Sequence, residues 1–153
     1  MRVPYTVFKA QAPQPSLGGG LDRPRPITPA RIYGPSGDYL IDGQLDSGAD
    51  DTIVPAWVGA AIGIDLTSIP EHFITLVGRP QPIRCRFLAV TLRITDGLQE
   101  TYKWPSVVGF VPLPLKRALF GYAGFLQFFD ADFRGARREV ILLPNNAFAG
   151  QSF

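Results

Sequence analysis

Glycine and proline interrupt this chain so often that they limit its fold more than any other feature. The sequence contains 16 glycines and 15 prolines among 153 residues. Both residues are unfavourable inside helices, and proline also lacks a backbone N–H, so short strands joined by turns are favoured over long helices. With 46% apolar and 18% charged residues, the composition predicts one globular, mainly β domain.

Several classes of function are disfavoured by composition. A single histidine, His72, and a single cysteine, Cys85, provide neither a zinc cluster nor an intrachain disulfide. The net charge of +2 is too small to indicate a nucleic-acid partner. Because no apolar run reaches the roughly 18 residues that cross a bilayer, and no signal-peptide stretch opens the chain, we expect a soluble cytoplasmic protein with no membrane partner, metal or other cofactor.

The chain divides into three parts. Residues 1–27 are expected to hold a short strand at 4–9 and a linker, because five prolines and three consecutive glycines lie within 11–29. Residues 28–144 form the main domain. Residues 145–153 are a C-terminal tail.

Turn signals delimit the elements of the main domain. The tetrapeptide Gly34-Pro35-Ser36-Gly37 predicts a tight turn between two strands. A short strand at 52–55 and a short helix at 56–62 should follow, with Gly63 ending the helix. Further strands are expected at 100–104, 106–111, 126–132 and 139–143.

A hairpin is predicted from two strands, 73–77 and 83–94, joined by 78–82. The apolar side of the second strand changes near Phe87: Ile83 and Cys85 lie on one side, and Val90 and Leu92 on the other. A strand packed on one core would keep a single alternation. This change of side predicts a hairpin that projects over a cleft before its second strand enters the body.

Residues 45–55, LDSGADDTIVP, carry the most informative motif. A carboxylate, Asp46, follows an apolar strand and opens a Ser-Gly turn, and an apolar strand follows. Asp-Ser-Gly is also ordinary turn chemistry, so the tripeptide alone does not indicate a catalytic residue. The surrounding residues make the motif more specific.

This segment resembles the active-site motif of the retropepsins, the retroviral-type aspartic proteases. A second match, Ala118-Leu119-Phe120-Gly121 followed by Gly124-Phe125-Leu126, stands at the expected distance downstream. The hairpin at 78–82 lies between the two, where the family has its flap. The resemblance covers residues 28–144 and is closer to free-standing bacterial members than to viral polyprotein segments. It implies a closed β-barrel of the acid-protease type, one short helix near the C-terminal part and a flap hairpin.

The resemblance also implies roles for individual residues. Asp46 would be catalytic, and Ser47, Gly48 and Gly121 would support its loop. Substrate would contact Gly48, Ala49, Asp50, Asp51 and, on the flap, Val77, Gly78 and Arg79. Solvated turn acids remain the alternative for Asp50 and Asp51.

Peptide hydrolysis without a metal or a covalent nucleophile requires an activated water and a proton donor. Two neighbouring carboxyl groups that share one proton supply both. This chain has one such motif and is too short for two lobes. If the site is catalytic, the protein must be a homodimer in which each chain contributes Asp46.

Two departures from the family pattern leave other functions open. Tyr122 stands where many retroviral enzymes have an arginine that supports the dimer. Pro80 and Pro82 lack the N–H groups that a glycine-rich flap offers to substrate. The alternative is therefore a weak or inactive module that binds peptides or dimerises. A third hypothesis is that the enzyme removes its own N-terminal segment by cutting within 11–29.

Overall fold

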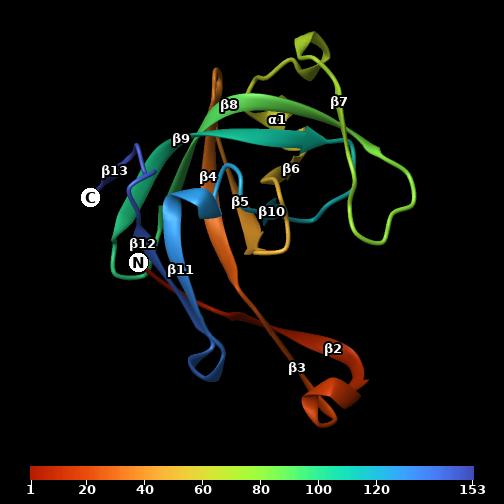
Figure 1. Cartoon of the computed structure of the whole chain (residues 1–153), viewed down its shortest axis with the longest axis vertical. Coiled ribbons are helices and arrows are strands. Elements are labelled where there is room, and N and C mark those ends of the chain that lie inside the picture. Colours follow the sequence, from red (N-terminus) through yellow and green to blue (C-terminus); the bar gives the residue numbers. More distant parts are fainter.

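The computed structural model describes residues 1–153 as a closed β-barrel with two hairpins that project from it (Figure 1). Six strands close the ring in the order β9-β6-β10-β5-β4-β8, and β8 pairs with β9. Their bounds are β4 Ile27–Gly34, β5 Gly37–Leu45, β6 Ile53–Pro55, β8 Ile83–Thr95, β9 Thr101–Val111 and β10 Ala118–Phe120. The mainly β class and the closed barrel are confirmed.

The hairpin β4–β5 turns at Gly34-Pro35-Ser36-Gly37, as the turn residues predicted. Gly34 pairs with Gly37, and the strands stay in register back to Ile27 and Gln44. Beyond the hairpin, β10 lies parallel to β5, and β6 lies parallel to β9. The parallel pair of β5 and β10 brings the end of β5, where Asp46 follows, beside the end of β10.

The change of apolar side along β8 is confirmed, and it reflects two separate cores. Ile83 and Cys85 are buried in a small cluster with Ile53 and Val111. Leu92 on the opposite side belongs to the main core of 24 residues. The strand changes face because its first half packs beside the chain's main cleft and its second half packs inside the barrel.

The strands expected at 100–104 and 106–111 are one continuous strand, β9. Pro105 is the residue that lies between the two expected strands. Pro105 pairs in register with Thr91 of β8, its side chain is exposed, and no other strand pairs with β9 at that position. Proline is tolerated there because a missing N–H does not matter on an edge that has no strand partner.

One α-helix, α1 (Ala56–Ala61), forms where the sequence predicted it, and Gly63 follows with φ of +80°. The additional short helix expected near the C-terminal part is a single 3-10 turn at Leu126–Phe128. Phe125 and Phe129 on either side of this turn are buried in the main core and pack on Trp104. The chain enters the strand β11 at Phe129, which leaves no length for an α-helix. Two further 3-10 turns lie at Leu66–Ser68 and Gly135–Arg137.

A separate three-stranded sheet contributes buried side chains to the main core. β12 (Glu139–Pro144) lies between β1 (Arg2–Pro4) and β11 (Phe129–Arg134). The buried Met1 ammonium group is 2.9 Å from the carboxylate of Glu100 and donates a hydrogen bond to the carbonyl oxygen of Leu142. In the tail, β13 (Gln151–Ser152) pairs with β9.

The prediction of a linker at 11–29 is wrong. β2 (Thr6–Gln14) and β3 (Gly20–Arg25) form an antiparallel hairpin, here called the N-terminal arm (residues 6–25), which projects from the body (Figure 1). Pro15 begins a 3-10 turn at Pro15–Leu17, and Gly18 and Gly19 have positive φ. The prolines and glycines that suggested a linker therefore build the turn of a hairpin.

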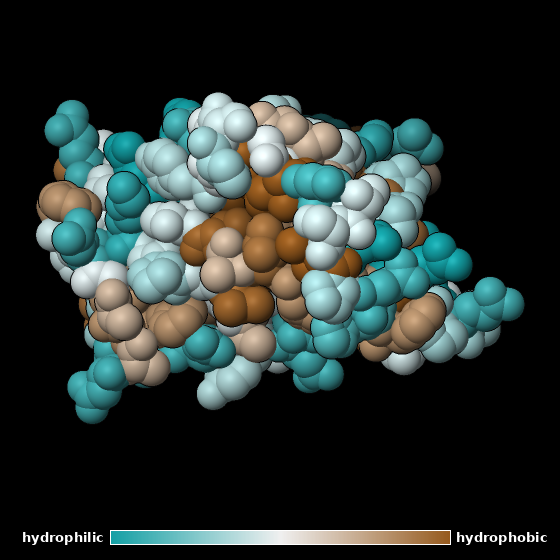
Figure 2. All heavy atoms as spheres, turned by 90° about the horizontal axis from the view of Figure 1, so that it is seen from above, coloured by the Kyte–Doolittle hydropathy of each residue, from teal (hydrophilic) through white to brown (hydrophobic).

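Polar side chains cover much of the surface, but apolar residues gather in a central hollow on the face seen from above (Figure 2). No helix is long and apolar enough to cross a membrane.

Candidate active site

The loop after β5 holds the carboxylate of Asp46 through backbone hydrogen bonds. The N–H of Asp46 donates to the carbonyl oxygen of Phe120 at 3.0 Å, and the N–H of Ala49 donates back to the carbonyl of Asp46. The N–H of Gly48 donates to Oδ1 of Asp46 at 2.9 Å. The Ser-Gly turn therefore fixes one carboxylate oxygen and leaves the other free for a ligand.

Gly121 packs directly beneath this loop, as the resemblance implied. A Cβ added at Gly121 would lie 2.3 Å from the carbonyl oxygen of Asp51 and 2.7 Å from that of Ala49. On either side of this contact, Tyr122 N–H donates to Ala49, and Ala123 N–H donates to Asp50, both at 2.8 Å. Only glycine permits the two segments to approach so closely.

The Asp46 loop opens into a cleft of about 630 Å³. The loop forms one wall and the β7 segment (His72–Ile74) with the residues after it forms the other. Of the sequence-predicted residues, six line this cleft: Asp46, Gly48, Ala49, Asp50, Asp51 and Val77. Ser47, Gly78 and Arg79 are exposed and do not line it, and Gly121 is buried behind it.

Other lining residues had no specific role in the sequence-based site: Phe73, Ile74, Thr75, Leu76 and Leu119. Their positions in the sequence were the signal that could have identified them as site residues. Residues 73–76 lie in or beside the predicted first strand of the hairpin, and Leu119 lies in the second motif. Ile53 also lines the cleft. These side chains make most of the wall apolar.

The β7–β8 hairpin is fastened at its base and free at its tip. Glu71 forms an ion pair with Arg86 at 3.0 Å, and the Arg86 guanidinium also donates to the carbonyl of Ile69. At the tip, Gly78 has φ of +81°, and Val77 is fully exposed. The base therefore holds the hairpin beside the cleft while its tip faces solvent.

The ionisable groups of the site are acidic. Burial raises the pKa of the Asp51 carboxyl, and the charge of Asp50 raises it further. Burial, with the nearby Asp51 charge, raises the pKa of the Cys85 thiol to about 11, so this thiol is a poor nucleophile near neutral pH. No group of three or more His, Cys, Asp or Glu side chains is arranged to hold a metal ion.

This chain supplies one turn-held carboxylate in a largely apolar cleft. A single carboxylate can accept a proton from water, but it cannot at the same time donate one to a scissile carbonyl. A second Asp46 loop from another copy would complete an acid–base pair.

The sequence matches no protein-family model and no curated protein. Solved structures do match. A crystal structure of a retropepsin-like aspartic protease from Rickettsia conorii aligns with a TM-score of 0.51 at 14% identity, covering 97% of this chain and 94% of that chain. The retroviral protease-like domain of Ddi1 from Leishmania major aligns at 15% identity with a TM-score of 0.49, covering 80% and 96%. EIAV protease in complex with an inhibitor aligns at 15% identity with a TM-score of 0.38, covering 63% and 81%.

At 14% identity, the match to the Rickettsia conorii protein is a likeness of fold. It extends over nearly the whole of both chains. The chain therefore has a retropepsin-like fold.

Proposed function

We propose that this protein is an aspartic endopeptidase that acts as a homodimer. Asp46 from each chain would form the acid dyad, with one carboxylate taking a proton from water and the other carboxyl protonating the scissile carbonyl oxygen. The observation that carries the proposal is the Asp46 turn. Its backbone hydrogen bonds to Gly48 and Phe120 present one free carboxylate oxygen to a cleft.

The cleft indicates the kind of peptide that would be cut. Ile53, Leu76 and Leu119 provide apolar walls, which favour large apolar side chains next to the scissile bond. Ile74, at the end of β7, and Leu76, just after this strand, both line the cleft. An extended peptide would lie along this segment as an added strand.

Replacement of Asp46 tests the proposal. We expect the purified protein to cleave members of a peptide library and Asp46→Asn to lose at least about 1,000-fold in kcat/KM, because the dyad can no longer share a proton. The matched control is Asp42→Asn, which removes an exposed carboxylate four residues earlier on β5. Equal cleavage by wild type and Asp46→Asn would refute the mechanism.

Dimerisation and pH give independent checks. Specific activity should fall on dilution as dimers dissociate, because one chain holds half of the dyad. The activity optimum should be mildly acidic, since the dyad must keep one proton. A rate that rises steadily above neutral pH would contradict the shared proton.

A non-catalytic peptide-binding or dimerisation module is the second candidate. Two observations favour it: Tyr122 is 64% exposed at the position where an arginine would support the dimer, and the hairpin tip carries Pro80 and Pro82. This candidate predicts no Asp46-dependent cleavage, and a module that only binds peptides should also be a monomer at micromolar concentration in sedimentation.

A further inference from the structure

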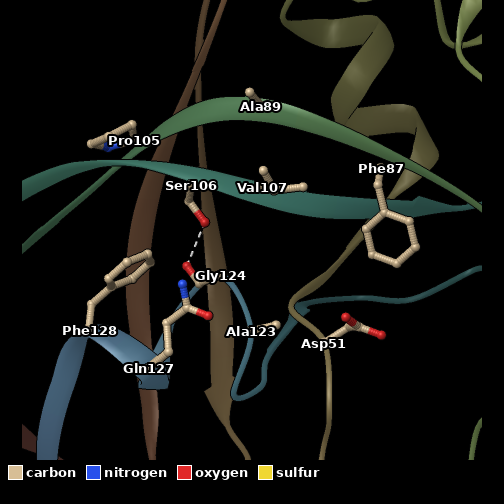
Figure 3. Close-up of a pocket in the computed structure, with 10 residues that line it drawn as sticks. All are labelled: Asp51, Phe87, Ala89, Pro105, Ser106, Val107, Ala123, Gly124, Gln127 and Phe128. Atoms are coloured by element: carbon tan, nitrogen blue, oxygen red, sulfur yellow. Dashed lines mark hydrogen bonds between the residues drawn. The ribbon is translucent and has the colours of Figure 1, made fainter. Parts of the chain in front are cut away.

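A second cavity, of about 310 Å³, lies outside the cleft and shares one wall residue with it (Figure 3). We call it the Asp51 groove. It is lined by Asp51, Phe87, Ala89, Pro105, Ser106, Val107, Ala123, Gly124, Gln127 and Phe128. We propose that the Asp51 groove binds the cationic side chain of an arginine or lysine in the peptide substrate. This inference rests on the proposed function, because it places the cation on a peptide that lies in the cleft.

Asp51 is the one charged residue of the groove, and it has no counter-ion within the chain. Only burial and the charge of Asp50 act on its pKa, and both raise it. A partly buried carboxylate without a hydrogen bond or ion pair is destabilised in its charged form. A bound cation would relieve this, so the groove is electrostatically complementary to a positive charge.

The remaining walls suit a long aliphatic stem with a cationic head. Figure 3 shows the ring of Phe87 next to the Asp51 carboxylate, while Phe128 and Gln127 lie toward the opposite end. Pro105 and Val107 form apolar sides. Arginine and lysine bury apolar stems against such surfaces, and a guanidinium can pair with a carboxylate while it stacks on an aromatic ring.

The backbone carbonyl oxygen at the centre of the groove, that of Gly124, already has hydrogen-bond donors within the chain. The carbonyl oxygen of Gly124 accepts a hydrogen bond from Ser106 Oγ at 2.6 Å and another from Trp104 Nε1. Besides the side-chain amide of Gln127, the Asp51 carboxylate is then the acceptor that lines the groove, and it is the one that carries a charge. A divalent metal is a poor alternative, because no cluster of His, Cys, Asp or Glu accompanies Asp51.

Asp51 is held rigidly between the two cavities. It bridges to Ala123, and the neighbouring Thr52 N–H donates to the carbonyl of Ala123 at 2.9 Å. Because Asp51 lines both the cleft and the groove, a peptide in the cleft can direct one side chain past it into the groove. The carboxylate would then select a basic residue away from the scissile bond, instead of binding substrate backbone as the sequence suggested.

Binding can be measured without catalysis. The protein carrying Asp46→Asn would be titrated with Nα-acetyl-arginine amide, and the Gln127 side-chain amide and Val107 methyl groups would be followed by NMR. The neutral isostere Nα-acetyl-citrulline amide is the ligand control. We expect arginine to shift these signals and citrulline to bind about five- to tenfold more weakly, the scale of one charge-assisted contact at a partly exposed site.

Two variants and one control variant locate the binding site of the probe. Asp51→Asn should weaken the arginine probe to the level of citrulline, whereas Asp50→Asn, whose residue lines the cleft but not the groove, should preserve the preference for arginine. Val107→Arg should also abolish probe binding, because it places a cation in the groove from a side chain that is 55% exposed. Equal binding of arginine and citrulline, or arginine binding unaffected by both Asp51→Asn and Val107→Arg, would overturn the inference.

Cleavage separates this inference from the proposed function. In the enzyme with Asp46 intact, library cleavage should show a preference for Arg or Lys at one fixed position outside the scissile pair. Asp51→Asn should remove that preference by raising KM while kcat changes little. Cleavage with no basic preference would overturn the inference and leave the peptidase intact. Arginine binding in a protein that cleaves nothing would overturn the peptidase and retain the cation groove.

Discussion

The carbonyl oxygen of Phe120 accepts a hydrogen bond from the N–H of Asp46 at 3.0 Å, and this contact joins the two motifs that were recognised separately in the sequence. Phe120 is completely buried, and its ring stacks on Phe125 with centroids 4.4 Å apart. The position of the Asp46 loop therefore depends on an aromatic core that lies behind it.

Gly121→Ala should destabilise the protein and abolish activity that depends on Asp46. The new Cβ would lie 2.3 Å from the carbonyl oxygen of Asp51, so one of the two backbones must move. We expect urea unfolding to show that the free energy of unfolding falls by about 1–3 kcal/mol, as for other overpacked sites. The matched control is Gly135→Ala, where an added Cβ meets no atom within 4 Å. Similar stability of the two variants would contradict the close packing.

Phe125→Ala should lower the free energy of unfolding by about 3–5 kcal/mol, the range for removing a fully buried aromatic ring. Phe125 contacts Phe120, Trp104 and Phe129 within the main core. Phe133→Ala removes a ring that is 40% exposed and should change stability by less than about 1 kcal/mol. Chemical denaturation of both variants tests this ranking, and equal losses would refute it.

Glu100→Gln should make stability less dependent on acid pH. The Tyr102 hydroxyl donates to the Glu100 carboxylate, and this hydrogen bond, with the Met1 ammonium, lowers the pKa of Glu100 below 4.5. A lowered pKa contributes stability that is complete above the unfolded value and is lost as pH falls toward the folded one. Because the carboxylate is 42% exposed, we expect this contribution to the free energy of unfolding to be only about 1 kcal/mol.

Unfolding curves at several pH values measure this contribution. The difference in unfolding free energy between wild type and Glu100→Gln should be constant above about pH 5.5 and shrink progressively below pH 4.5. A difference that grows on acidification would mean that the pKa is shifted in the opposite direction.

The N-terminal arm should be dispensable for folding of the barrel. Thr6 and Arg25 are directly paired, so Asn-Gly can replace residues 7–24 and close a short hairpin. The aromatic contact of the arm is with Arg117, whose guanidinium lies 4.8 Å from the centre of the Phe8 ring. Removing this contact should lower the free energy of unfolding by only about 1 kcal/mol. A shortened chain that fails to fold would show that the arm is part of the core.

Mass spectrometry tests whether the enzyme cuts its own arm. Strand pairing between β2 and β3 occupies backbone groups that a protease would need, so we expect active wild-type protein and Asp46→Asn to have the same intact N-terminus. Removal of the arm in wild type but not in Asp46→Asn would establish self-processing instead.

Much of the barrel and of the Asp46 site follows from local sequence. The Gly34–Gly37 turn, the helix at 56–61 and the change of side along β8 were predicted because turn chemistry and alternation act within a few residues. The pairing of the Asp46 loop with Gly121 was available only through the resemblance, since nothing local indicates that the two segments meet.

The N-terminal arm shows why composition alone misled. Clustered prolines and glycines are equally suited to a flexible linker and to the turn and edges of a hairpin. What decides between them is whether the strands on either side can pair, as Phe8 does with Arg23. That information lies in residues far enough apart that no local pattern contains it.

Local patterns suffice to predict a mainly β chain with one turn-held aspartate, because these properties depend on neighbouring residues. The surroundings of that aspartate depend on how the whole chain packs. Asp51, Phe87, Val107 and Gln127 come from four separate segments and form one groove only after the barrel closes. Long-range packing fixes such a groove: β6 pairs in parallel with β9, and Asp51 bridges to Ala123, which brings these separate segments together.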